Sequence, residues 1–407
     1  MQRSAGGVFY GWWIVATCFV VNFIVFGISV NTFTVYLKPI EADLGWSRGK
    51  ISLGLTLAAL AMGAGAPVIG RLIDRTGARS IMAVGAIIVG GSTVLLASMQ
   101  SLGFFYTVFV ISGLGQAAAT LIPISLVISN WFRAKRAQAL AIAMTGTGLG
   151  MMVMVPVTNW IVSNWGWRTS FRIMGCAILT TVPLTLLLIR TRPAEMNLSP
   201  DGGDIGSAEA APASAGLTLA EAVRTRAFWL IGSMMLFAGL LAMGIGVHLM
   251  PYLTDIGYPA ATAALFISVI AAFTVVGKLG MGFLADRWGI RQAVVLTYAL
   301  IFVGILLLIG AGNFAVACGF AVVWGCVIGG PLILNPTLAA ECLGLRSFGA
   351  VFGVLTLLNT VGVAMGAFVS GVIYDTSGSY VPAFILFAVL SVVAGVCGAL
   401  ARRAYAA

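Results

Sequence analysis

The sequence predicts an all-α membrane protein in which twelve transmembrane helices form two pseudo-symmetric six-helix bundles. Three observations carry this prediction. Of the 407 residues, 60% are hydrophobic and only 8% are charged. The apolar residues fall into long runs, six on each side of one polar break. A motif that begins at residue 70 recurs at residue 282, a separation of 212 residues, which indicates an internal repeat.

The composition excludes an ordinary water-soluble domain, in which about 25% of the residues are charged. A lipid bilayer accommodates such a chain, because each spanning helix needs about 20 mostly apolar residues. Helices are the expected spans, since a helix satisfies its own backbone hydrogen bonds in lipid. The first apolar run, residues 12–36, is too long for the apolar region of a cleaved signal peptide, so we expect it to remain as a span.

Gly, Pro and charged residues separate the apolar runs and so define the spans. The predicted spans are residues 12–36, 50–70, 80–98, 102–130, 137–162, 170–189, 227–252, 259–283, 292–311, 313–340, 347–371 and 379–401. We therefore expect an N-terminal bundle over residues 1–191, a polar cytoplasmic linker over 192–225 and a C-terminal bundle over 226–407. Near the linker's end, Thr218 and Glu221 have the spacing of a capping box, which predicts a short surface helix.

The net charge of +10 suits a membrane protein better than a nucleic-acid-binding protein, because the cations gather in loops on one side. With a cytoplasmic N-terminus, sixteen of the 22 Lys and Arg residues fall on the cytoplasmic side and five on the other. This bias predicts that both termini and the linker are cytoplasmic. The lipid bilayer is the expected partner, and no nucleic-acid partner is expected.

The repeated motif has the pattern G-x-L-x-D-R-x-G-x-R and follows the second and eighth spans, at 70–79 and 282–291. Its glycines allow a sharp turn between helices. Its aspartate can accept hydrogen bonds from a helix N-terminus, and its arginines can pair with acids. Such contacts can hold the cytoplasmic side shut in one state and release it in another. The residues assigned to this cytoplasmic gate are Gly70, Asp74, Arg75, Arg79, Gly282, Asp286, Arg287 and Arg291.

The doubled motif resembles that of the major facilitator superfamily, and the resemblance covers nearly the whole chain. Four further segments are similar to the branch that holds bacterial monocarboxylate transporters and oxalate:formate antiporters. These segments are Tyr10–Trp13, Asp43–Arg48, Pro193–Gly202 and Arg226–Trp229. The resemblance implies a monomeric carrier of the bacterial inner membrane, in which two bundles alternate access to a central site. It implies no cofactor and no metal.

The distribution of ionisable residues indicates the charge of the substrate. All twelve acidic residues lie in loops or at the ends of the predicted spans, whereas Lys278 lies inside the eighth span. Lys278 precedes Asp286 by eight residues, which places it about 12 Å from the cytoplasmic loop. Helical side chains lean toward the helix N-terminus, so the ammonium points toward mid-membrane. A transported anion is then its natural counter-ion, and the alternative is that the side chain extends to the cytoplasmic surface.

In the carriers that this chain resembles, the eighth span bears a substrate-binding cation, usually arginine. The resemblance assigns that role to Lys278. Eukaryotic monocarboxylate carriers have an aspartate one turn earlier, where this chain has Thr274, and oxalate carriers add a cation in the eleventh span, where this chain has none. One cation fits one carboxylate, so we expect a lactate- or pyruvate-like monocarboxylate. An oxalate/formate-type exchanger and an efflux carrier for an amphipathic solute remain alternatives.

His248, the only histidine, lies near Gly244, Gly246 and Pro251, which can break the seventh span. It is either a polar residue near the outer interface or a group that binds substrate or carries a proton. Other polar side chains in the spans either bind substrate or join helices. The candidates for the substrate site are Lys278, His248, Asn31, Gln116, Thr120, Asn335 and Asn359. Asn31 stands where some relatives have a functional lysine.

Two alternatives to a carrier of organic anions are disfavoured by the residues in the spans. An intramembrane enzyme is not expected, because the spans contain no nucleophile motif, paired carboxylates or metal-ligand cluster. An exporter of cationic solutes would be helped by a carboxylate in the membrane, and the predicted spans contain none. The sequence leaves open whether protons are a second partner, and whether transport is uniport, symport or exchange.

Overall fold

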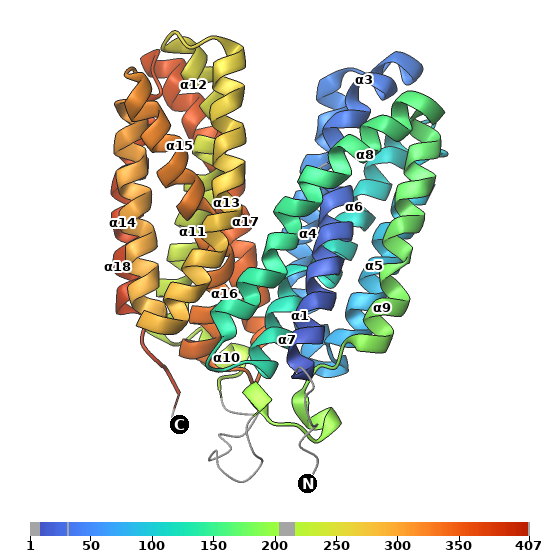
Figure 1. The fold of residues 1–407 in the computed structure, drawn as a ribbon, viewed down its shortest axis with the longest axis vertical. Helices are drawn as coiled ribbons and strands as arrows, with labels where there is room; N and C mark the ends of the chain where they lie inside the picture. The colour runs from blue at the N-terminus through green and yellow to red at the C-terminus, as the bar shows by residue number, and fades with distance from the viewer. Residues whose placement is uncertain (1–8, 31, 203–215, 406–407) are drawn as a thin grey trace. The chain divides into compact units, whose positions relative to one another are not determined.

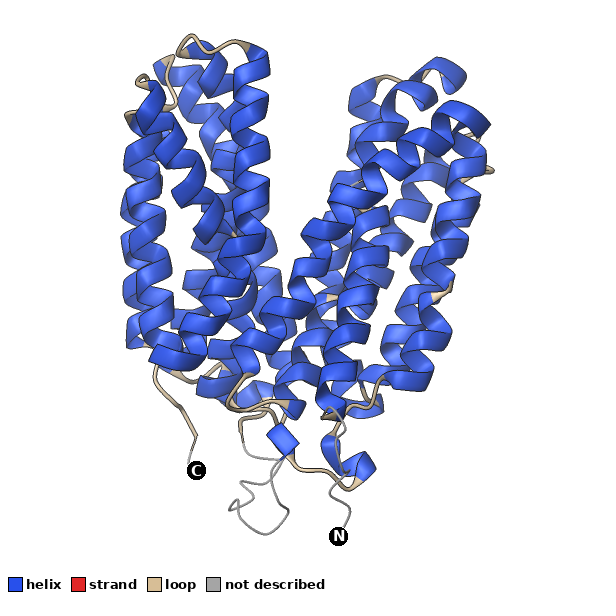
Figure 2. Ribbon diagram, viewed as in Figure 1, coloured by secondary structure: helices blue, strands red, loops and turns tan. Residues whose placement is uncertain are grey.

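The computed structural model describes residues 9–30, 32–202 and 216–405 as long helices joined by short loops (Figures 1 and 2). The chain divides into two compact units, residues 1–214 and 215–407. The helices of the first unit are α1 Tyr10–Val21, α2 Gly27–Ser29, α3 Phe33–Leu44, α4 Arg48–Thr76, α5 Ala78–Leu96, α6 Leu102–Ala119, α7 Leu121–Trp131, α8 Arg136–Leu179 and α9 Thr181–Leu188. It also contains the π-helix η1 Asn22–Phe26 and the 3₁₀ turns η2 Pro193–Met196 and η3 Pro200–Gly202.

The second unit repeats this arrangement of helices. Its helices are α10 Leu219–Ala222, α11 Arg226–Gly246, α12 Leu249–Asp255, α13 Ala260–Trp288, α14 Ile290–Ile309, α15 Phe314–Ile328, α16 Gly330–Leu343, α17 Phe348–Ser377 and α18 Val381–Leu400. In each unit we refer to the end that carries the repeated motif as the motif end and to the opposite end as the far end.

The count of twelve spans is confirmed by the helices. Eleven stretches among the described residues are long and apolar enough to cross a membrane, and one of them, 136–188, contains 53 residues. That stretch is long enough for two spans of about 20 residues. The backbone of Gly166 has φ 78° and ψ 162°, which interrupts α8 and separates the fifth span from the sixth. Glycine suits this turn because it has no Cβ to clash at positive φ.

Close helix crossings hold each unit together, and glycines make them possible. In the first unit, a Cβ on Gly146 of α8 would lie 2.5 Å from the carbonyl oxygen of Phe19 in α1. In the second unit, a Cβ on Gly362 of α17 would overlap the carbonyl oxygen of Leu236 in α11. These glycines are 216 residues apart (362 minus 146), so the two units use the same device at related positions. Small residues let backbones approach closely where lipid provides no hydrophobic force between helices.

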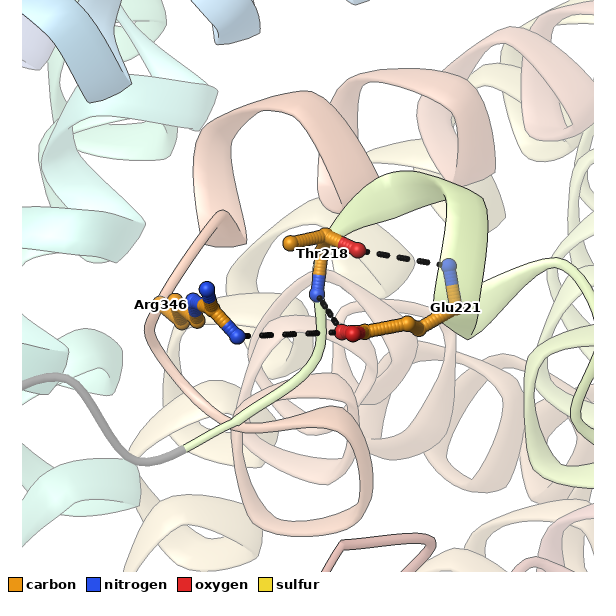
Figure 3. Close-up of polar contacts among 3 residues, drawn as sticks. All are labelled: Thr218, Glu221 and Arg346. Atoms are coloured by element: carbon orange, nitrogen blue, oxygen red, sulfur yellow. Dashed lines mark hydrogen bonds and ion pairs between the residues drawn. The ribbon is translucent and has the colours of Figure 1, made fainter.

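The end of the linker packs on the second unit (Figure 3). Gly216 pairs with Gly344, and the Leu217 N–H donates to the Leu343 carbonyl at 2.9 Å. Glu221 Oε2 accepts the Thr218 N–H at 2.8 Å, while Thr218 Oγ1 accepts the Glu221 N–H at 3.3 Å. The predicted capping box is therefore confirmed, and it begins the short helix α10. Arg346 Nη1 lies 3.9 Å from Glu221 Oε2, and both side chains are about half exposed.

The other end of the linker packs on the first unit. Asp201 Oδ2 accepts the Arg133 N–H at 2.9 Å and the Ala134 N–H at 3.0 Å, in the loop between α7 and α8. Each described end of the linker is thus tied to a different unit. The capping box is suited to analysis by pH, because the pKa of its Glu221 carboxyl group is lowered.

The attachment of α10 should depend on pH in the acid range. Hydrogen bonds from the backbone and side chain of Thr218, with a smaller effect of Arg346, lower the pKa of Glu221. A carboxyl group with a lowered folded pKa stabilises the folded state above its unfolded pKa, and that stability is lost as pH falls through the folded pKa. We expect the Ala222 amide, which donates to the Thr218 carbonyl, to stay protected at neutral pH and to open below the ordinary titration range of glutamate.

Hydrogen exchange followed by mass spectrometry, corrected for the intrinsic exchange rate, checks this expectation across that range. The matched control is Glu221→Gln, which keeps an acceptor oxygen and removes the titration, so its protection should not change with pH. Parallel pH profiles in the two proteins would contradict the assignment.

Candidate functional site

Lys278 lies in the interior of α13, ten residues before its last residue, Trp288. Its side chain is only 5% exposed. The Thr274 hydroxyl, one turn earlier, donates to the Ile270 carbonyl at 2.8 Å and so bonds to its own helix. Because Lys278 is buried, its side chain does not extend to the surface. The arrangement places a buried ammonium group on an apolar helix, beside a threonine whose hydroxyl is already engaged.

A helix interruption faces Lys278. The tenth span is divided into α15 and α16 at Gly329, and Pro331 follows in the first turn of α16. Proline has no N–H to donate to the preceding turn, so a helical hydrogen bond is lost beside Gly329, whose own backbone stays in the right-handed helical region at φ −81° and ψ −14°. A Cβ on Gly329 would lie 2.7 Å from Lys278 Cγ and 3.1 Å from Thr274 Cγ2. The lysine stem therefore crosses the backbone at the interruption itself.

The fourth span has a matching interruption. It is divided into α6 and α7 at Thr120, whose backbone has φ −117° and ψ −112°. The Thr120 hydroxyl donates to the Gln116 carbonyl at 2.7 Å, and both residues are buried. Thr120 and Gly329 are 209 residues apart, close to the motif's separation of 212. Interruptions at corresponding positions of two repeats are the feature that marks binding sites in repeat-built carriers.

Sequence reasoning missed these interruptions, although a signal for one of them was present. The run Gly329-Gly330-Pro331 is a strong local helix breaker inside an otherwise apolar span. Thr120 has no comparable breaker, because Pro123 lies three residues later, in the first turn of α7. The sequence makes Gln116 and Thr120 candidates for the substrate site because they are polar side chains in a span. The structure places both where α6 ends and α7 begins.

His248 lies at the far end of the second unit, where α11 ends and α12 begins, as the local glycines and Pro251 predicted. Its Nε2 is 3.0 Å from the Ala367 carbonyl oxygen, and its Nδ1 is 3.2 Å from the Tyr380 hydroxyl. A carbonyl oxygen only accepts, so Nε2 donates, and in the neutral ring Nδ1 accepts the tyrosine proton. Both ring nitrogens are engaged with α17 and the start of α18. A substrate contact would require one of them to be released.

The remaining candidates differ in what they contact. Asn359 Nδ2 donates to the Met235 carbonyl at 2.7 Å, which joins α17 to α11. Asn335, on α16, is 6% exposed, and within the described part of the chain its Oδ1 is buried without a hydrogen-bond partner. A buried acceptor without a partner is costly, so the amide oxygen of Asn335 is a candidate to receive a hydrogen bond from a ligand or a water molecule. Asn31 lies outside the described residues.

Sequence reasoning missed Asn22. This side chain is 1% exposed in the π-helix η1, and its Nδ2 donates to the Ala143 carbonyl of α8 at 3.1 Å. It therefore joins the first and fifth spans as Asn359 joins the seventh and eleventh. Single π-helical turns within α-helices occur frequently at functional sites, but no periodicity in the sequence reveals one.

The two motif copies have the same backbone and burial. Gly77 has φ 85° and Gly289 has φ 97°, so each copy turns at its second glycine. The residue after each glycine is buried, and in the first copy the Ala78 N–H donates to Thr191 Oγ1 at 3.0 Å. The Nε atoms of Arg79 and Arg291 are both buried and, among the described residues, have no hydrogen-bond partner. The repeat seen in the sequence is thus a repeat in three dimensions.

The fold and the doubled motif agree with the comparison to known proteins. A model described as Major Facilitator Superfamily matches residues 15–367. The chain belongs to the major facilitator superfamily. Its family and fold are those of transporters rather than enzymes, and its many apolar helices make it a multi-pass membrane protein. The resemblance stated from the motif residues is confirmed.

Several superfamily relatives are monocarboxylate transporters. Monocarboxylate transporter 13 of Rattus norvegicus is 24% identical, over 93% of this chain and 85% of that protein. Monocarboxylate transporter 2 of Mus musculus is 25% identical, over 95% of this chain and 83% of that protein. The uncharacterized MFS-type transporter YcxA of Bacillus subtilis (strain 168) is 24% identical, over 86% of this chain and 85% of that protein.

Solved superfamily structures confirm the fold. The proton:xylose symporter XylE, bound to 6-bromo-6-deoxy-D-glucose, matches with a TM-score of 0.73 and 13% identity, over 96% of this chain and 94% of that one. FucP in the outward conformation matches with a TM-score of 0.74 and 13% identity, over 94% of this chain and 97% of that one. At this identity the likeness concerns the fold alone.

The two asparagine contacts should contribute to stability separately. We expect Asn22→Ala and Asn359→Ala each to lower the free energy of unfolding by about 0.6 kcal/mol, the average for a hydrogen bond between membrane helices. Because the two residues lie in different units, the effects should add in the double variant. Thermal unfolding in detergent checks both values. Unchanged midpoints in the single variants, or a double variant no worse than one single, would contradict this reading.

Proposed function

We propose that this transporter carries a small monocarboxylate, such as lactate or pyruvate, by alternating access, and that Lys278 binds the carboxylate. The observation that carries the proposal is the burial of Lys278 in the interior of α13, next to the interruption at Gly329. The names of the relatives support the same substrate class. The matched interruptions at Thr120 and Gly329 support a site at the middle of the spans.

The energetics favour an anionic substrate. An ammonium group at bilayer depth costs about 2.5–3.5 kcal/mol on insertion scales. A carboxylate that reaches Lys278 forms a charge-assisted hydrogen bond, worth about 1.5–3 kcal/mol. Lysine acts as a point charge, without arginine's bidentate fork, so it accepts carboxylates in several orientations. This tolerance suits a carrier that must release its substrate as well as bind it.

A monocarboxylate is preferred to a dicarboxylate because the second cation is missing. The eleventh span, α17, contains no lysine or arginine between Phe348 and Ser377. Asn335, with its buried amide oxygen, can accept a hydrogen bond from a hydroxyl group of the substrate or from a protonated substrate. The exchange of oxalate and formate remains the competing function, and uptake of oxalate in preference to monocarboxylates would favour it.

The other predicted residues have secondary roles in this proposal. The arginines and aspartates of the two motif copies close the cytoplasmic side, on which both termini and the linker lie, in the inner membrane of a bacterial cell. His248 controls the far end when its contacts to Ala367 and Tyr380 break and re-form. A proton carried with the substrate would use His248, Lys278 or the substrate itself. The chain acts as a monomer and needs no cofactor.

Removing the ammonium should abolish most transport. In proteoliposomes we expect Lys278→Ala to reduce uptake of labelled lactate or pyruvate about 10- to 100-fold, the loss of one charge-assisted hydrogen bond. Lys278→Arg, which keeps the charge, should retain part of the uptake. The matched control is Lys38→Ala, which removes an exposed ammonium from α3 and should transport as the parent does.

Three results would contradict the proposal. Lys278→Ala could transport as fast as the parent, Lys38→Ala could lose transport to the same degree, or the parent could take up none of lactate, pyruvate, formate and oxalate. Competition among these four acids at equal concentration ranks them and separates a monocarboxylate carrier from an oxalate exchanger.

A further inference from the structure

Gly329 lies where the Lys278 stem passes over the interrupted tenth span. A Cβ built on Gly329 would lie 2.7 Å from Lys278 Cγ, 3.1 Å from Lys278 Cε and 3.1 Å from Thr274 Cγ2. All three atoms belong to side chains, and two belong to the lysine. The stem of Lys278 therefore occupies the space that any side chain at position 329 would need.

The helices on either side of this contact are fixed by backbone contacts. One turn earlier on α15, a Cβ on Gly325 would lie 2.8 Å from the Ile270 carbonyl oxygen and 2.7 Å from Phe273 Cβ, both on α13. A Cβ on Gly277, next to Lys278, would overlap the Cys326 carbonyl oxygen. At this crossing α13 and α15 touch through their main chains, so a side chain added here would meet no flexible group that could move aside.

These two environments have different consequences for an added methyl group. At Gly325 or Gly277 the methyl would meet main-chain atoms and would force the helices apart. At Gly329 it would meet the flexible lysine stem and one threonine methyl. Crowding there is relieved by a change in the side-chain torsions of Lys278, which moves the ammonium while the helices keep their places.

We propose that Gly329 is the positioning residue for the Lys278 ammonium, an inference that rests on the proposed function. Because position 329 has no side chain, the lysine stem lies flat against the interrupted backbone, and the charge is held at one place in the site. The run Gly329-Gly330-Pro331 has two effects. It interrupts the helix, and it leaves space in which the Lys278 stem packs. A larger residue at 329 displaces the charge that meets the carboxylate.

The experiment measures KM and maximal rate in proteoliposomes, using whichever of labelled lactate, pyruvate, formate and oxalate the parent takes up fastest. Gly329→Ala is expected to raise KM about 10- to 100-fold, as a displacement of about 1 Å in a binding group does. The midpoint of thermal unfolding should stay near that of the parent. This split between KM and stability would not arise from a purely structural role.

Two glycines within α15, the helix that ends just before Gly329, supply matched controls. A Cβ on Gly319 would meet only Leu307 Cδ1, at 3.9 Å, so Gly319→Ala should match the parent in KM and in unfolding midpoint. Gly325→Ala should lower the unfolding midpoint, because its methyl meets the main chain of α13. In this series Gly319→Ala reports the effect of helix propensity, Gly325→Ala reports the effect of crowding at the helix crossing, and Gly329→Ala reports the effect on Lys278.

A compensating substitution gives a second test. Thr274→Ser removes Cγ2, one of the three atoms nearest to the added methyl, and leaves the hydroxyl that bonds to Ile270. In the Gly329→Ala background it should lower KM at least threefold toward the parent value, because the lysine stem regains room. No recovery of KM would show that the added methyl acts on something other than the stem.

The outcomes distinguish this inference from the function on which it rests. Undiminished transport by Lys278→Ala overturns the proposed function. If Lys278→Ala loses transport while Gly329→Ala keeps the parent KM, only the role of Gly329 is overturned. A Gly329→Ala protein that fails to fold, or that loses unfolding midpoint as Gly325→Ala does, also overturns it, because the inference requires the methyl to displace a side chain and not a helix.

Discussion

The burial of one ammonium group is the constraint on which the account of this transporter depends. Lys278 is only 5% exposed in the interior of a membrane-spanning helix, where holding a cation is costly. The proposed function accounts for this cost, because a carrier of anions must attract its substrate, hold it away from water and release it. A backbone-to-backbone crossing of α13 and α15, made by Gly277 and Gly325, keeps the lysine at a fixed place in the second unit.

Both units combine closely packed helix crossings with an interrupted helix at a corresponding position. Close glycine crossings and the amides of Asn22 and Asn359 tie neighbouring spans together in each unit. Breaks at Thr120 and Gly329 interrupt corresponding spans, and irregular backbone inside a membrane protein is tolerated where it is buried in protein or lines a cavity. The proposed alternating access requires both features, since a bundle that deformed throughout would not keep Lys278 in place.

The sequence predicted the spans, the repeat and the capping box because each is a local signal. Apolar runs report the spans, and the helix starts at Thr218 because its side chain and that of Glu221 are three residues apart. Lys278 could be selected because a lone cation in an apolar run is conspicuous in any sequence. The break at Thr120 could not be predicted, since the three alanines before it favour a continuous helix and Pro123, three residues later, does not mark Thr120 as the point of the break.

The sequence also could not predict which residues far apart in the chain contact one another. Gly329 is one of 51 glycines in the sequence. Only the three-dimensional structure shows that a side chain at this position would collide with Lys278. The engagement of both His248 nitrogens, one by a carbonyl 119 residues away and one by a hydroxyl 132 residues away, likewise depends on how the seventh, eleventh and twelfth spans pack. Long-range contacts of this kind carry no periodic signature in one sequence, so polar candidates in the spans could be named but not assigned a partner.

The most direct test of the central claim is an experimental structure of the transporter with the proposed carboxylate substrate bound. The account predicts one carboxylate oxygen within about 2.7–2.9 Å of Lys278 Nζ, the length of a charge-assisted hydrogen bond. A substrate bound elsewhere, with its carboxylate away from Lys278, would contradict the account and leave the superfamily fold with an unidentified substrate site.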